Sequence, residues 1–224
     1  MFTLDTNAAR AADNKSSFID EAGEYIGTFT RAEYLEKKET GSTGIGLTFK
    51  SREGAEAQFY INLTYQHGTR NEGGFQLINA LMACMSLRSV GAPSQVAVEK
   101  WNSDTKQREK VSVPGFPELM GKPIGLLIQM EIEKNSRTGL PRPTIYAPFS
   151  AEFEKTASEI LDKVAVPAKL EKMVQALIAR PLIDRRPAGS RSAPQQSQQG
   201  APGPDADPFD DDIPFLPLPY LAGI

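Results

Sequence analysis

Apolar and polar positions alternate along the first third of the chain, and this pattern predicts three β-strands. Residues 24–36 are rich in aromatic and β-favouring side chains, and residues 45–49 and 55–64 alternate apolar with polar or small residues. Glycine-containing turns at 40–44 and 52–54 separate the three segments. We therefore expect an antiparallel meander with one apolar and one polar face.

A change of period after this meander predicts a helix. The apolar positions that recur at helical spacing are Phe75, Ile78, Leu81, Met82 and Met85. Gly91 and Pro93 follow them and are typical of a helix end. An amphipathic helix over residues 73–88 is therefore expected between the third strand and the next one.

The middle of the chain predicts more strands. Residues 96–113 could supply one or two strands, residues 117–120 a short helical turn, and residues 123–134 a strongly apolar strand paired with one near 143–148. The expected fold is mainly β (α+β): a five- to six-stranded antiparallel barrel of the oligonucleotide-binding (OB) type, with an inserted helix. We assign residues 1–150 to this domain.

The last third is predicted to change from helical to disordered. Apolar stripes within residues 151–180 indicate two helices that pack on the barrel or on a second copy of the chain. Residues 181–204 are dominated by Pro, Ala, Gly, Ser and Gln, a composition that favours a disordered linker. Residues 205–224 form an acidic tail.

The charge is unevenly divided between these parts. Three basic and six acidic residues follow residue 180; removing them from totals of 25 and 28 leaves 22 of each in residues 1–180. The overall charge of the domain therefore does not identify nucleic acid as a partner, although a neutral domain can still carry one basic face.

The chain offers little catalytic or metal-binding chemistry. It has one histidine, His67, and one cysteine, Cys84, so zinc sites built from His and Cys are not expected. We expect no enzyme activity, no cofactor and no metal. No apolar run is long enough to span a membrane and no secretory signal is evident, so a cytoplasmic location without membrane association is expected.

The tail contains the most specific motif in the sequence. An Asp-rich hexapeptide stands behind the linker: Asp210, Asp211, Asp212, Ile213, Pro214 and Phe215. It resembles the C-terminal end of bacterial single-stranded DNA-binding proteins, and the resemblance implies recruitment of replication and repair enzymes through an aromatic anchor. Here nine more residues follow Phe215, so either this extension is a second anchor or the chain docks through Ile224. A merely solubilising tail is the alternative.

The domain resembles phage-encoded single-stranded DNA-binding and recombination-associated proteins. The matching segments are residues 33–39, the turn at 40–46, Leu47-Thr-Phe49, the helix at 76–87, and residues 119–122. The resemblance implies an OB-type fold, single-strand binding in phage DNA replication, recombination or repair, and a place in the cytoplasm of a bacterial host.

Single-strand binding requires a basic groove for phosphates and aromatic faces for bases. The candidate residues are Arg31, Lys50, Arg52, Tyr60, Lys100, Trp101, Lys106, Arg108, Lys110, Arg137, Arg142 and Tyr146. Tyr60 and Trp101 are expected to stack on bases, and the acidic tail could compete with DNA for the cations. The alternatives are an adaptor that binds proteins rather than DNA and a strand-annealing protein; a homo-oligomer is possible.

Overall fold

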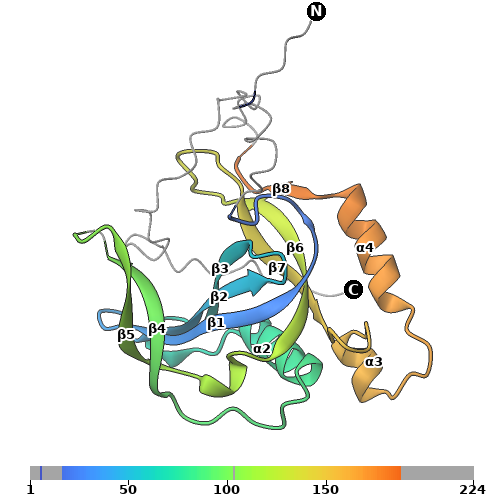
Figure 1. Cartoon of the computed structure of the whole chain (residues 1–224), viewed down its shortest axis with the longest axis horizontal. Coiled ribbons are helices and arrows are strands. Elements are labelled where there is room, and N and C mark those ends of the chain that lie inside the picture. Colours follow the sequence, from blue (N-terminus) through green and yellow to red (C-terminus); the bar gives the residue numbers. More distant parts are fainter. Residues whose placement is uncertain (1–5, 7–16, 103, 188–224) are drawn as a thin grey trace, which may run out of the picture.

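The computed structural model describes residue 6, residues 17–102 and residues 104–187 (Figure 1). The fold is mainly β, as expected. Most of the expected linker and all of the acidic tail lie outside the described residues. In the described part, no helix has the length and apolar character that crossing a membrane would require.

The expected meander is confirmed. It consists of β1 (Gly23–Lys37), β2 (Ser42–Ser51) and β3 (Glu56–Thr64), paired antiparallel in that order. Phe49 faces Phe29 on one side and Ala57 on the other, so the apolar positions of the three strands lie on one face. The alternation seen in the sequence is thus the alternation of side chains across a pleated sheet.

The remaining elements follow the predicted order with more strands than expected. They are η1 (Gln66–Gly68), α2 (Glu72–Cys84), β4 (Ser94–Asn102), β5 (Gln107–Gly115), η2 (Pro117–Leu119), β6 (Pro123–Ile132), β7 (Arg142–Phe149), α3 (Ala157–Leu161), α4 (Lys169–Ala179) and β8 (Leu182–Asp184). The structure describes eight strands instead of five or six, because residues 94–115 form a complete hairpin and the start of the expected linker forms β8.

The sheet is not closed into a barrel, which corrects the expectation. β6 pairs with the first half of β1 and with β7, but no ladder among the described strands joins β7 to β3. Other segments occupy the outer edge of β3: the backbone of Glu56 bonds to Ser17 and Ile19, and Asn71 donates to the carbonyls of Asn62 and Leu63. Because these groups already have partners, they cannot pair with β7.

The main core lies between the inner face of the meander, β6 and α2. Phe29 and Phe49 are fully buried there and meet edge to face, with ring centroids 5.8 Å apart. α2 approaches β3 closely: a β-carbon on Gly74 would lie 1.9 Å from the carbonyl oxygen of Asn62. Cys84, at the end of α2, is buried, and His67 is exposed.

α4 packs on the opposite side of the sheet, where Figure 1 shows it running alongside β6. Leu170 and Leu177 of α4 contact the buried Leu127 of β6 and Phe149 of β7. Of the apolar residues of this helix, Leu170 and Leu177 are buried in this cluster, whereas Ile178 is 65% exposed. β8 continues from it and pairs parallel with β6, opposite Met130 to Ile132.

The first C-terminal helix is shorter than the apolar stripe predicted. α3 has only five residues, and two members of the stripe are largely exposed, Phe153 at 56% and Leu161 at 71%. Glu159 is instead the buried centre of this region. Its carboxylate accepts hydrogen bonds from the backbone N–H groups of Ala168 and Lys169 at 2.7 and 2.8 Å, which connects α3 to the start of α4.

Candidate nucleic-acid interface

The outer face of the meander is polar, and one of its positions beneath a large side chain is a glycine, Gly44. Because side chains alternate across a strand, the buried Phe49 and Phe59 place their neighbours Lys50 and Tyr60 on the outside. Tyr60 lies over Gly44, where a β-carbon would come within 2.3 Å of the tyrosine hydroxyl oxygen. Burial of this ring raises the pKa of Tyr60. A glycine at position 44 is therefore required for Tyr60 to lie against the sheet.

The β4–β5 hairpin begins at β1. Gly115, at its base, pairs with Glu33, and the N–H of Phe116 donates to the carbonyl of Ala32 at 2.8 Å. A β-carbon on Gly115 would lie 2.5 Å from that same carbonyl oxygen, so a larger residue would separate the hairpin from β1. Figure 1 shows the hairpin beside the meander, away from α4.

The hairpin bends back over the outer face. Lys100 is six residues from the base at Ser94, which would be about 20 Å along a straight strand. Even so, its Nζ lies 2.8 Å from Oε1 of Glu33, a residue that pairs with the base itself. The hairpin must therefore curve across β1 towards β2 and β3.

One ion-pair cluster lies under the curved hairpin. In this Glu33 cluster, made of Arg31, Glu33 and Lys100, the carboxylate lies 2.9 Å from Nε of Arg31 and 2.8 Å from Nζ of Lys100. The side chains of Arg31 and Glu33 are only 7% exposed. Arg31 was a candidate phosphate contact; the structure places it beneath the surface because its charge is paired with Glu33.

A second cluster joins the far part of the hairpin to β2 and β3. In this Glu56 cluster, made of Lys50, Glu56 and Arg108, the guanidinium of Arg108 donates two hydrogen bonds to the carboxylate, at 3.1 and 2.6 Å. Nζ of Lys50 lies 3.9 Å from Oε1 of the same carboxylate. The hydrogen bonds that Arg108 donates to the carboxylate of Glu56 raise the pKa of Arg108. Lys50 and Arg108 are each half exposed.

The two clusters together carry a net positive charge. Four cations share two carboxylates, so the formal sum is +2 on one face of a domain with no overall charge surplus. Each carboxylate is shared by two cations. Such a face can attract phosphate groups even in a neutral protein.

The hairpin also carries the only tryptophan of the chain. Trp101 faces Arg108 across β4 and β5 and is partly exposed. It lines a shallow hollow of about 390 Å³ together with Lys100, Asn102, Asp104, Glu109 and Val111. Hydrogen bonds from Asn102 and Thr105 lower the pKa of Glu109. Lys106 and Lys110 are exposed on the same hairpin.

The remaining candidates are not members of these clusters. Arg52 is exposed in the turn between β2 and β3. Arg137, Arg142 and Tyr146 belong to the β6–β7 hairpin, where Arg142 pairs with Glu133 at 3.8 Å. Tyr146 is 40% exposed at a break in the β6–β7 register. The structure thus brings the charged groups of Lys50, Lys100 and Arg108 to one face, places Trp101 opposite Arg108 on the hairpin, and leaves these four at the margins. The six residues of the acidic motif lie outside the described residues.

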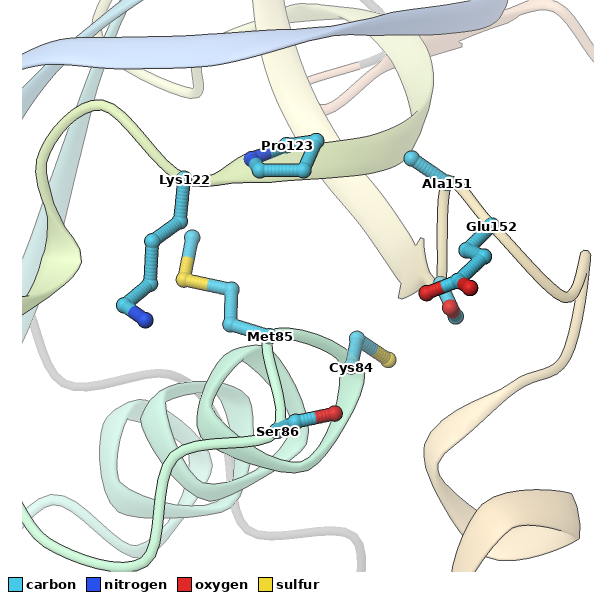
Figure 2. Close-up of a pocket in the computed structure, with 8 residues that line it drawn as sticks. Cys84, Met85, Ser86, Lys122, Pro123, Ala151 and Glu152 are labelled. Atoms are coloured by element: carbon cyan, nitrogen blue, oxygen red, sulfur yellow. The ribbon is translucent and has the colours of Figure 1, made fainter.

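A second hollow, of about 110 Å³, lies between the end of α2, the start of β6 and the segment after β7 (Figure 2). Cys84 lines it, but burial raises the pKa of this thiol to about 12. The neutral thiol is a poor nucleophile and a poor metal ligand. Lys122 and Glu152 lie on opposite sides of this hollow in Figure 2 and do not form a shared site.

Sequence reasoning did not select the two acids that organise the interface, Glu33 and Glu56. The alternation placed Glu56 on the polar face of its strand, and that parity was the available signal. Its partner Arg108 is 52 residues away, and Lys100 is 67 residues from Glu33. Known proteins do not assign the site either: no protein-family model matches the chain, and a search of curated proteins found no match.

Proposed function

We propose that the chain binds single-stranded DNA without strong sequence preference on the outer face of the meander, under and beside the β4–β5 hairpin. The observation that carries this proposal is the convergence of Lys50, Lys100 and Arg108 on one face from three separate strands. The half-exposed cations supply contacts for a phosphate backbone, which any sequence presents alike.

The order of the strands supports the same function. β1, β2, β3, β6 and β7, with a helix after the third strand, follow the order of an OB module, which can be partly open. Such modules bind oligonucleotides on the face of their second and third strands and with the loops before the second and fifth strands. Here those parts correspond to Lys50, Tyr60 and the β6–β7 hairpin with Arg137.

Aromatic side chains at this face would supply the base contacts. Tyr60 lies on β3, and Trp101 lies on the β4–β5 hairpin. Stacking on one aromatic ring contributes about 1–3 kcal/mol per base and tolerates every base. Under this proposal the domain protects single strands during phage DNA replication or recombination, and the Asp210–Phe215 motif recruits partner enzymes.

The test is binding of labelled single-stranded and duplex oligonucleotides to the full chain over a series of salt concentrations. We expect a preference for the single strand and an affinity that falls steeply with salt, with a slope of about 0.7 per neutralised phosphate. Replacing Tyr60 by Leu should weaken single-strand binding about 5- to 150-fold, as expected for the loss of one stacked base. An affinity that does not change with salt would overturn the proposal and favour a protein-binding adaptor.

A further inference from the structure

The β4–β5 hairpin is attached to the sheet in two different ways. At its base the attachment is backbone pairing, between Gly115 and Glu33 and between Phe116 and Ala32. Beyond the base, the two ion-pair clusters connect it to the meander. Its own apolar cluster is small, consisting of Val96, Val98 and Val113 with Met120 packed against them. The position of the hairpin over the face therefore depends strongly on charge.

The two clusters differ in how easily they can open. Glu33 and Arg31 are buried, so separating them would leave a buried charge without its partner, which costs several kcal/mol. Glu56 is 14% exposed and its partners Lys50 and Arg108 are half exposed. Water and ions reach the second cluster, so its pairs contribute far less and can exchange partners.

The carboxylate of Glu56 occupies the position that a phosphate would need. It accepts two parallel hydrogen bonds from the guanidinium of Arg108, the arrangement with which arginine also binds phosphate. Lys50 approaches the same carboxylate from β2. A backbone phosphate that bound here would meet both cations only after Glu56 had given up Arg108.

We infer that Glu56 holds the β4–β5 hairpin against the sheet in the free protein, and that a phosphate of the bound strand displaces it from Arg108 and frees the hairpin to close on the strand. This inference rests on the proposed function for its ligand. The pair of Arg31 and Glu33 stays intact and acts as the pivot, because both side chains are buried at the place where the hairpin leaves β1.

The first test uses the tryptophan on the hairpin as an internal probe in the full chain without DNA. Replacing Glu56 by Gln removes the charge that holds Arg108, so the fluorescence anisotropy of Trp101 should fall. Arg108→Gln breaks the same contact from the exposed side and should give the same fall. Glu171→Gln, an exposed position on α4 with the same change of charge, is the matched control and should leave the anisotropy as in the wild type.

The second test measures binding of a labelled single-stranded oligonucleotide to the same variants. Glu56→Gln should bind about two- to fivefold more tightly than the wild type, the range expected for removing a competing, partly exposed ion pair. Arg108→Gln should not bind more tightly, because it loses a phosphate contact together with the hold on the hairpin. Thermal unfolding followed by circular dichroism checks that each variant is folded.

The outcomes separate this inference from the proposed function. Unchanged Trp101 anisotropy in both Glu56→Gln and Arg108→Gln would overturn the holding role of Glu56, even if the wild type binds DNA. Equal affinity of wild type and Glu56→Gln for the oligonucleotide would overturn the displacement step. A wild type that does not bind oligonucleotide at all would overturn the proposed function, while the anisotropy of the free variants still tests whether Glu56 holds the hairpin.

Discussion

The two faces of the meander are built from neighbouring residues and are stabilised by different forces. On β2, Phe49 is fully buried in the inner core, whereas the next residue, Lys50, is half exposed and lies near Glu56. The inner face excludes water, so its stability changes little with salt. The outer face is held by ion pairs, which salt weakens. One strand can therefore keep a rigid core on one side and exchange partners on the other.

The largest expected effect comes from breaking the inner face. Phe49→Ala should lower the free energy of unfolding by about 3–5 kcal/mol, because it removes a fully buried ring and leaves a cavity. Urea unfolding followed by circular dichroism measures this loss. Lys50→Gln is the matched control one residue away, and it should change the stability by no more than about 0.5 kcal/mol. Similar losses for both variants would contradict the assignment of the two faces.

A buried carboxylate outside both faces gives the next largest effect. Hydrogen bonds from the N–H groups of Ala168 and Lys169 and from Thr156 lower the pKa of Glu159 to about 2, against desolvation, which opposes the shift. Because the pKa of Glu159 is lower in the folded state, the ionised carboxylate stabilises the fold at pH values above its ordinary pKa of 4.5. This contribution is lost as the pH falls from there towards about 2.

Replacing Glu159 by Gln should therefore destabilise the protein by about 1–3 kcal/mol near neutral pH, since three backbone N–H donors lose a charged acceptor. The difference from the wild type should shrink as the pH is lowered through the range between 4.5 and about 2. Urea unfolding at several pH values measures both quantities. Glu171→Gln, on the exposed side of α4, should match the wild type throughout. A difference independent of pH would argue against a role of the ionised carboxylate.

The smallest expected effect concerns Lys50 on the outer face of the meander. Lys50→Gln should reduce the salt dependence of single-strand binding by about one phosphate contact, with a modest loss of affinity at low salt. The slope of the logarithm of affinity against the logarithm of salt concentration measures it. Lys172→Gln on α4 removes the same charge from an exposed position and should leave the slope unchanged. Equal slopes for the wild type, Lys50→Gln and Lys172→Gln would contradict a phosphate contact by Lys50.

Much of the fold could be predicted because its signals are local. The alternation around Leu47 and Phe59 determined two strands of the meander, and the helical spacing around Leu81 determined α2. The prediction of a longer helix at α3 was wrong, and the cause lies close by in the chain. Its apolar stripe was long, but Glu159 directs the chain into a short turn by bonding Ala168 and Lys169, and periodicity does not register such a contact.

The interface could be predicted only in part. Lys50, Lys100, Trp101 and Arg108 were recognised by residue type, and the structure brings the charged groups of the three cations to one face. Arg31 was recognised by type too, yet it is buried, because the hairpin bends over it and Glu33 neutralises it. Exposure of a charged residue depends on what packs above it, and that information is not contained in the residue or its neighbours.

The alternating faces of the strands, the position of the inserted helix and the cations available for an interface follow from local sequence, because they depend on side chains a few positions apart. The open sheet and the β4–β5 hairpin that lies across it do not follow from local sequence. Both depend on contacts between distant segments: Glu56 with Ser17 and Ile19 at one edge, and Glu56 with Arg108 over the face. Such contacts form only after the chain has folded, so no local pattern records them.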